Sequence, residues 1–127
     1  MAYGQKVVAI IDDEPAVRDS LATLIKSLGY RAEVYGSGEE FIKAALSSEA
    51  GCLLVDIHLG DITGFELIRH ILSMGLLLPV VFMTGSQEAG LRKEAGDFGC
   101  VAFLLKPFPA SDLAEVIEEA IGKANAI

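Results

Sequence analysis

The chain has 127 residues, of which 10 are Lys or Arg and 18 are Asp or Glu, so its formal net charge is −8. Such an acidic surface repels phosphate backbones and anionic lipids, which argues against direct binding to nucleic acid or to a membrane. The longest apolar run, residues 76–83, is too short to cross a bilayer, and the N-terminus lacks the plan of a signal peptide. We therefore expect one soluble, cytoplasmic domain, 1–127.

Short apolar segments alternate with segments of helical periodicity along the whole chain. Strands are expected at residues 6–11, 30–35, 52–56, 79–84 and 101–105. Helices are expected at residues 15–28, 39–46, 63–74 and 87–97, with a last one beginning near 111. This alternation predicts an α/β fold in which helices cover both faces of a parallel sheet through right-handed crossovers.

Two of the expected helices carry informative local signals. The fourth, 87–97, contains Gly90 and Gly96, and each glycine costs a helix about 1 kcal/mol relative to alanine. It is therefore the weakest helix and the one best able to shift. Ser111 or Asp112 is expected to cap the last helix.

Polar residues follow the predicted strands where each strand ends, namely Asp12, Asp13, Asp56, Thr84 and Lys106. In a parallel sheet these carboxyl ends share one edge, where open α/β sheets bind their ligands. Three crowded carboxylates repel one another, and a hard cation such as Mg²⁺ removes that conflict with oxygen ligands. A carboxylate placed beside a cation, a lysine and a hydroxyl is suited to accept a phosphoryl group.

Taken singly, each of these residues has a simpler interpretation. Asp12 and Asp13 are suited to cap the first helix, and Asp56 to a turn after a strand. Thr84 is a common residue at a strand end, and Lys106 would be an ordinary solvated loop lysine. The combination is what favours a site.

At these spacings the five residues resemble the receiver domain of two-component response regulators, over a core of about residues 6–122. Segments 34–41 and 106–108 are most similar to receivers of the LuxR/FixJ type, which precede helix-turn-helix output domains. The resemblance implies a flavodoxin-like, doubly wound (βα)5 fold with a five-stranded parallel sheet in the order 2-1-3-4-5.

The resemblance also implies a role for each site residue. Asp56 would accept the phosphoryl group, and Mg²⁺ (or Mn²⁺) would be bound by Asp12, Asp13, Asp56 and the backbone carbonyl of His58. Beyond self-catalysed phosphoryl transfer and autodephosphorylation, such a domain is not an enzyme.

Thr84 and Lys106 would bind the phosphoryl group, and Thr84 with Phe103 would form the switch. The implied donor is a sensor histidine kinase or a histidine phosphotransfer protein. The implied target is a downstream protein or an output domain missing from this chain. The switching face would be formed by the fourth helix, fifth strand and fifth helix, with a phosphorylation-dependent homodimer as a further expectation.

Two features depart from the family pattern or stand outside it. Receivers usually carry proline four residues after the phosphoacceptor, where this chain has Gly60 followed by Asp61. Glycine loosens the loop and Asp61 adds an anion, which puts the phosphoryl lifetime in question. Cys52 and Cys100 are expected to be buried thiols without a disulfide.

Two other functional classes fit the pattern less well. A phosphatase with an aspartyl-phosphate nucleophile would have a second acid two residues beyond Asp56, where His58 stands. A flavin-binding module would have a loop rich in Gly, Ser and Thr after the first strand, but residues 12–14 are all acidic and repel phosphate unless a metal is bound.

Overall fold

The computed structural model describes residues 6–124, in which strands and helices alternate from one end to the other. The strands are β1 (Val7–Ile11), β2 (Arg31–Tyr35), β3 (Cys52–Asp56), β4 (Val80–Thr84) and β5 (Ala102–Leu105). The helices are α1 (Pro15–Ser27), α2 (Gly38–Ala44), α3 (Gly64–Ser73), α4 (Leu91–Asp97) and α5 (Ala110–Ala124). Every predicted element is present in the predicted order.

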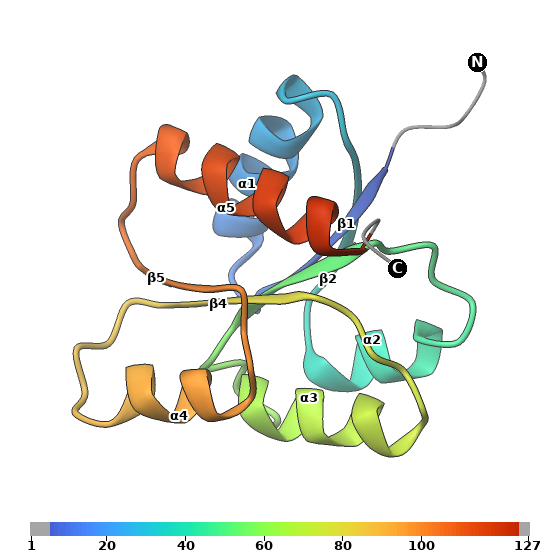
Figure 1. Cartoon of the computed structure of the whole chain (residues 1–127), viewed down its shortest axis with the longest axis vertical. Helices are drawn as coiled ribbons and strands as arrows, with labels where there is room; N and C mark the ends of the chain where they lie inside the picture. The colour runs from blue at the N-terminus through green and yellow to red at the C-terminus, as the bar shows by residue number, and fades with distance from the viewer. Residues whose placement is uncertain (1–5, 125–127) are drawn as a thin grey trace.

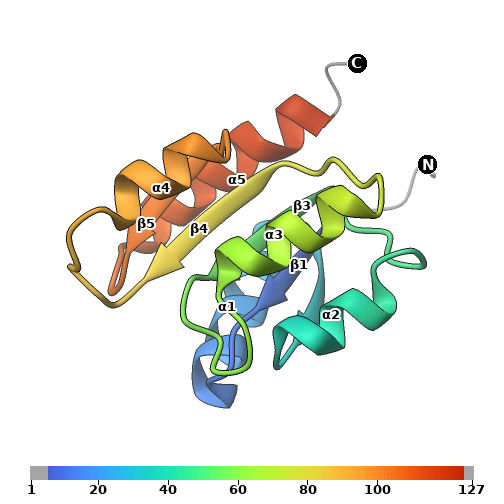
Figure 2. The ribbon, with the colours of Figure 1, turned by 90° about the horizontal axis from the view of Figure 1, so that it is seen from below.

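The strands form one parallel sheet in the order β2-β1-β3-β4-β5. Helices α1 and α5 cover one face, and α2, α3 and α4 cover the other (Figures 1 and 2). This is the doubly wound, flavodoxin-like arrangement expected from the sequence. The strand order reverses direction beside β1, so the carboxyl ends of β1 and β3 border the crevice where such sheets bind ligands.

The three central strands are buried along their whole length, as their unbroken apolar runs predict. Their side chains alternate between two separate cores. In β1, Ala9 and Ile11 join the core beneath α2, α3 and α4, whereas Val8 and Ile10 join the core beneath α1 and α5. The edge strands β2 and β5 are only partly buried. A rigid centre therefore carries the ends of β1, β3 and β4.

Helix α4 begins at Leu91 and has seven residues, which makes it shorter than the predicted 87–97. Its N-cap is Gly90, whose φ of +91° lies in the left-handed region that glycine adopts without strain. The N–H of Glu94 donates to the Gly90 carbonyl, which closes the first turn. Residues 85–90 thus form a loop after β4, and the predicted start of the fourth helix at residue 87 is wrong.

The predicted cap of the last helix is wrong. Helix α5 begins at Ala110, so Ser111 and Asp112 lie inside its first turn. The Pro109 carbonyl accepts hydrogen bonds from the N–H groups of Asp112 and Leu113, at 3.1 and 3.4 Å. The backbone carbonyl of Pro109 therefore closes the first turn of α5, three residues after the Lys106–Pro107 peptide bond, which is cis.

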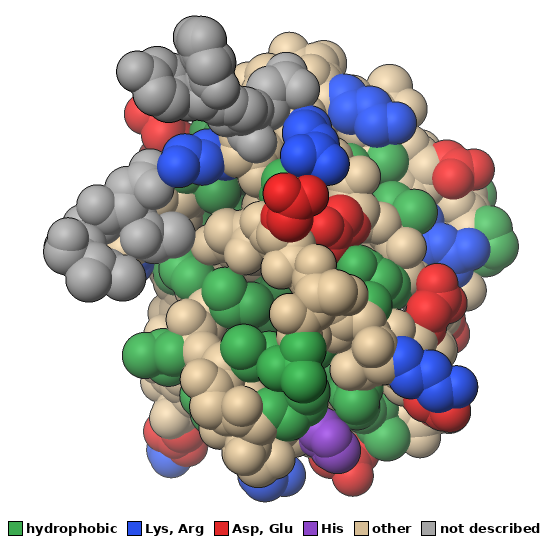
Figure 3. Space-filling view, turned by 90° about the vertical axis from the view of Figure 1, so that its right-hand side faces the viewer, with side chains coloured by type: hydrophobic (Ala, Val, Ile, Leu, Met, Phe, Trp, Pro, Cys, Tyr) green, Lys and Arg blue, Asp and Glu red, His purple; other side chains and the backbone are tan. Residues whose placement is uncertain are grey.

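Part of the apolar content lies on the surface. Apolar side chains gather in the lower half of the side that carries α2 (Figure 3), and the most exposed large ones are Leu46 and Leu77. Cys52 is buried, Cys100 is half-buried, and both thiols are free. Within residues 6–124, none of the helices combines the length and apolar character that a membrane crossing requires.

Candidate functional site

Three carboxylates meet at the carboxyl edge of the sheet. Asp56 is the last residue of β3 and is 5% exposed, and Asp12 directly follows β1 and is fully buried. Asp13 comes next and is exposed. One oxygen from each of the three side chains lies within 4.8 Å of the others. Because β1 and β3 are neighbours in the sheet, the sequence prediction that these acids converge is correct.

Lys106 forms ion pairs with two of these acids. Its Nζ donates to Asp12 Oδ2 and to Asp56 Oδ2, each at 2.7 Å. The lysine directly follows β5, and its backbone N–H donates to the Thr84 carbonyl at the end of β4. The sheet therefore fixes the start of a long side chain whose ammonium reaches back to the acids. Such short contacts with a charged donor are the stronger class of hydrogen bond.

The pKa values of Asp56 and Lys106 are both shifted from their ordinary values. Burial raises the pKa of the Asp56 carboxyl, and the hydrogen bonds from Lys106 and from the His58 N–H offset only part of that effect. For Lys106, burial lowers the pKa, but the hydrogen bonds to Asp12 and Asp56 raise it further, so the net shift is upward. The ammonium is therefore held charged beside the acids.

Backbone contacts hold both buried acids in place. The His58 N–H donates to Asp56 Oδ1 at 2.9 Å, and the Glu14 N–H donates to Asp12 Oδ1 at 2.9 Å. Arg18 on α1 donates from its guanidinium to the Asp12 carbonyl, also at 2.9 Å. A site role for Arg18 was not predicted from the sequence. Its one signal is that it follows Glu14, the N-cap of α1, by one helical turn.

A hollow of about 430 Å³ opens over Asp56. Its walls are Asp13, Glu14, Asp56, His58, Gly85, Ser86 and Lys106. A Cβ built on Gly85 would meet no atom within 4 Å, so this position leaves the wall open. Thr84 itself is fully buried, and its hydroxyl accepts a hydrogen bond from the Ser86 N–H at 3.0 Å. Ser86 and Glu14 were not predicted to line this hollow, because the conformation of a loop determines which of its side chains face a cavity.

Phe103 lies on β5, beside a second hollow of about 300 Å³. Its ring is half-buried, and the Arg92 guanidinium of α4 lies 4.7 Å from the ring centroid. Ser86 lines this hollow as well as the one over Asp56. The predicted switch residues Thr84 and Phe103 thus lie on the adjacent strands β4 and β5, and Ser86 borders the hollows on both sides.

The loop after β3 differs from its sequence interpretation. Gly60 has a φ of +89°, which a proline ring cannot adopt. The carboxylate of Asp61 accepts hydrogen bonds from the N–H groups of Gly38 and Glu39 at the start of α2. Its charge is therefore directed to α2, and the expectation that Asp61 adds an anion to the acidic cluster is corrected accordingly.

The donor set at the sheet edge fits Mg²⁺. The cluster consists of three carboxylates. One of them, Asp13, is exposed to solvent, and Lys106 forms its ion pairs with the other two. Hard cations of this kind take oxygen ligands and keep several waters, for which the open hollow has room. The described part of the chain brings no thiol or imidazole into this cluster, as a zinc site would require.

The sequence matches the response regulator receiver domain family over residues 8–118. The chain belongs to that family. The transcriptional regulatory protein FixJ of Azorhizobium caulinodans is 32% identical over 117 residues, which cover 92% of this chain and 56% of that protein. The response regulator protein TodT of Pseudomonas putida is 30% identical over 121 residues, which cover 95% of this chain and 53% of that protein.

Solved structures agree with these relationships. The crystal structure of FixJ-N superposes with a TM-score of 0.86 at 32% identity, covering 94% of this chain and 96% of that one. A CheY-like receiver from Methanospirillum hungatei gives a TM-score of 0.85 at 27% identity, covering 96% and 98%. This receiver spans about half the length of the curated relatives it matches. It is a response regulator receiver of two-component signalling.

Proposed function

We propose that this receiver accepts a phosphoryl group on Asp56 in a Mg²⁺-dependent reaction. The observation that carries the proposal is the position of Asp56 at a rigid strand end, with Lys106 Nζ at 2.7 Å and two further acids beside it. The donor would be a phosphohistidine of a sensor histidine kinase or of a histidine phosphotransfer protein. Family membership supports this donor class, because receivers act in two-component systems.

The reaction forms a bond between an Asp56 oxygen and phosphorus and breaks the phosphorus–nitrogen bond of the donor. The imidazole leaves with both electrons of that bond and, with one proton taken up from water, ends as neutral histidine. Lys106 supplies a fixed positive charge beside the attacking carboxylate, where charge stabilisation accounts for most of the catalysis of such transfers. Thr84 directly precedes Gly85 and Ser86 in the wall of the hollow, and its hydroxyl would bind a phosphoryl oxygen.

Asp12, Asp13, Asp56 and the carbonyl of His58 would hold the metal. When bound, Mg²⁺ would neutralise charge on the phosphoryl oxygens. The hydrogen bonds to Asp12 and Asp56 from backbone N–H groups keep these side chains oriented without the cation. Hydrolysis of the aspartyl phosphate by water would return the receiver to its starting state, and we propose no other enzymatic activity.

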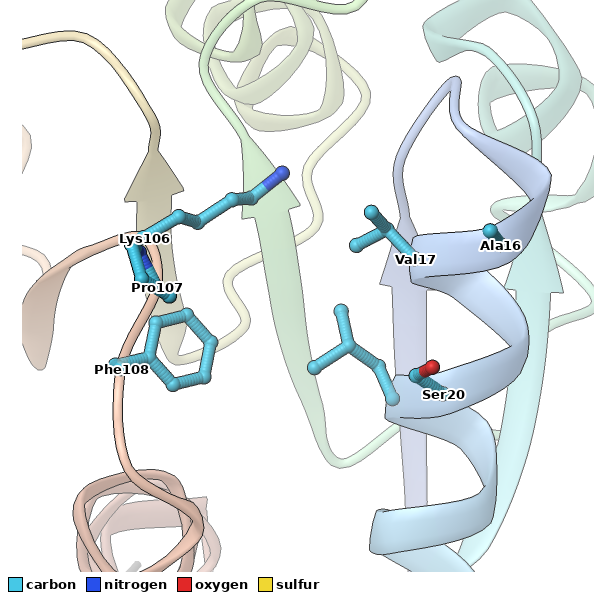
Figure 4. Close-up of a pocket in the computed structure, with 7 residues that line it drawn as sticks. Ala16, Val17, Ser20, Lys106, Pro107 and Phe108 are labelled. Atoms are coloured by element: carbon cyan, nitrogen blue, oxygen red, sulfur yellow. The ribbon is translucent and has the colours of Figure 1, made fainter.

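An apolar groove beside the site suits the docking of the donor. It lies between α1 and the segment after β5, has a volume of about 510 Å³, and is lined by Ala16, Val17, Ser20, Leu21, Lys106, Pro107 and Phe108 (Figure 4). The stem of Lys106 forms one wall, and its ammonium extends toward Asp56. An amphipathic helix packed into this groove would bring its histidine near the hollow over Asp56.

The output partner would be a downstream protein or an output domain, since the curated relatives are about twice as long. The proposed readout face comprises α4, β5 and α5, next to the hollow that holds Phe103 and Arg92. Phosphorylation would change the packing of that face, and a homodimer through it is part of the proposal.

Intact mass after incubation with acetyl phosphate and Mg²⁺ tests the function. We expect one added phosphoryl group, lost in mild base and absent when a chelator replaces Mg²⁺. Asp56→Asn should prevent the addition, whereas Asp97→Asn, an exposed acid on α4, should leave it intact. Full labelling of Asp56→Asn would show that another residue is the acceptor.

A further inference from the structure

The loop between β3 and α3, residues 57–63, is closed at its base by a β-bridge, and its tip contacts neighbouring elements. A β-bridge joins His58 to Thr63 across the base. At the tip, a Cβ built on Gly60 would lie 3.4 Å from Asp13 Oδ2 of the acidic cluster. The tip of the loop therefore lies close to the proposed metal site, which His58 also borders.

The same tip binds the start of α2. Asp61 Oδ1 accepts a hydrogen bond from the Gly38 N–H at 3.2 Å, and Asp61 Oδ2 accepts one from the Glu39 N–H at 3.0 Å. Ser37 Oγ accepts the next one, from the Glu40 N–H, at 3.1 Å. The first three N–H groups of α2 are thus all satisfied, two of them by a residue more than 20 positions away in sequence.

The contact is closely fitted. A Cβ on Gly38 would lie 2.6 Å from the end of the Ile62 side chain, so any larger residue at position 38 would force that side chain to move. Burial raises the pKa of Asp61, but hydrogen bonds from the N–H groups of Glu39, Ile62 and Gly38 lower it below its ordinary value. Asp61 therefore binds α2 as a carboxylate.

We propose that Asp61 is a positioning residue, which fixes the β3–α3 loop, and with it the His58 carbonyl, by binding the first two N–H groups of α2. Gly60 leaves this loop freer than a proline would, and the hydrogen bonds of Asp61 restore its rigidity from outside. The inference rests on the proposed function, because it takes the His58 carbonyl as a metal ligand.

The link also works in the opposite direction. If fixing the loop favours Mg²⁺, then Mg²⁺ must favour the contact between Asp61 and α2 to the same extent. Binding at the acidic cluster would accordingly protect the Gly38 and Glu39 amides from hydrogen exchange. This gives a readout at α2, away from the face of α4, β5 and α5.

Three variants separate positioning from its alternatives. Asp61→Ala removes both hydrogen bonds, and Asp61→Asn removes the charge but keeps one acceptor oxygen. Ser37→Ala removes a cap from the same helix without touching the loop. Each is titrated with Mg²⁺ by NMR, and amide exchange at Gly38 and Glu39 is measured with Mg²⁺ and with chelator.

We expect Asp61→Ala to weaken Mg²⁺ binding by roughly tenfold, as loss of a supporting partner of a metal ligand does. Asp61→Asn should weaken it less, and Ser37→Ala should leave it unchanged. Mg²⁺ should slow exchange at Gly38 and Glu39 in the wild type but not in Asp61→Ala.

Equal weakening by alanine and asparagine at position 61 would indicate a simple charge effect and overturn the inference. Equal weakening by Ser37→Ala would assign the effect to the stability of α2. Mg²⁺ affinity unchanged in Asp61→Ala overturns the inference while leaving the proposed function standing. Absence of Mg²⁺ binding by the wild type would overturn both.

Discussion

Lys106 and Asp56 are joined by a hydrogen bond of 2.7 Å although they are 50 residues apart in sequence. The lysine side chain is 17% exposed and the aspartate side chain 7%, so the pair is largely removed from water. The same ammonium binds Asp12. The ammonium of Lys106 is therefore the ion-pair partner of two buried carboxylates, and the stability of the site depends on this ammonium.

Lys106→Met should destabilise the receiver in chelator and make it more dependent on Mg²⁺. Without the ammonium, Asp12 and Asp56 become uncompensated buried charges, and removing one partner of a buried pair typically costs about 3–5 kcal/mol. A bound divalent cation supplies the missing charge, so added Mg²⁺ should raise the variant's free energy of unfolding more than the wild type's. Urea denaturation with and without chelator measures both effects.

Lys93→Met is the matched control, because Lys93 forms an exposed ion pair with Asp97 at 3.5 Å. Exposed pairs contribute about 0–1 kcal/mol, so this variant should resemble the wild type. An identical response to Mg²⁺ in Lys106→Met and the wild type would show that metal and lysine do not neutralise the same acids.

Asp56 should make the stability of the metal-free protein depend on pH in an uncommon direction. Burial raises its pKa in the folded state above the unfolded value of about 3.9, so the folded state takes up its proton first as pH falls. The ionised carboxylate thus opposes folding at neutral pH, and this opposition fades as pH falls through the folded pKa toward the unfolded one.

Asp56→Asn lacks this titration. In chelator we expect it to be more stable than the wild type at pH 7, with a difference that shrinks as pH approaches 4. Thermal unfolding across this range measures the difference, and Lys106 keeps its bond to Asp12 in the variant. A difference that grows on acidification would mean that the folded environment favours the charged form of Asp56.

Much of the fold and site was predictable because the decisive residues stand at strand ends. An apolar run that stops at an acid marks both a buried strand and its polar end, which is why the prediction for Cys52–Asp56 matches β3 residue for residue. The convergence of Asp12, Asp56 and Lys106 then follows from the shared edge of a parallel sheet.

What the sequence left open depends on contacts between separate loops. Arg18 reaches the Asp12 carbonyl because of how α1 leaves β1, and Asp61 reaches α2 because two loops meet over the sheet edge. Arginine on a helix and aspartate in a loop are ordinary in sequence. Neither pattern states which backbone group will lie within reach, so these roles emerge only in three dimensions.

Gly64 is required beside the phosphoacceptor, and Gly64→Ala should destabilise the fold by about 1–3 kcal/mol. A Cβ there would lie 2.7 Å from the backbone oxygen of Asp56, and backbone cannot move aside cheaply. Gly96→Ala is the control, since a Cβ there meets nothing within 4 Å and lies in α4. It should stabilise by about 0.5–1 kcal/mol. Urea denaturation compares them, and equal effects would contradict the crowding at Gly64.

The Thr84 hydroxyl should connect the site to Phe103. At rest it accepts the Ser86 N–H, and Ser86 lines both the hollow over Asp56 and the one beside Phe103. If the hydroxyl turns to a phosphoryl oxygen, the 85–90 loop loses that hydrogen bond and is free to rearrange. A phosphoryl mimic, beryllofluoride with Mg²⁺, should therefore change amide exchange most in residues 84–106.

Thr84→Ser and Thr84→Val distinguish the effect of the hydroxyl group from the effect of the side chain's shape. Serine keeps the hydroxyl, so the response in residues 84–106 should persist. Valine keeps the shape but cannot bind the mimic or accept the Ser86 N–H, so the response should fade although Asp56 still takes up a phosphoryl group. Hydrogen exchange measures the response in residues 84–106, and intact mass measures the phosphorylation of Asp56. A full response in Thr84→Val would place the connection elsewhere, and changes confined to α2 and α3 would place the readout on another face.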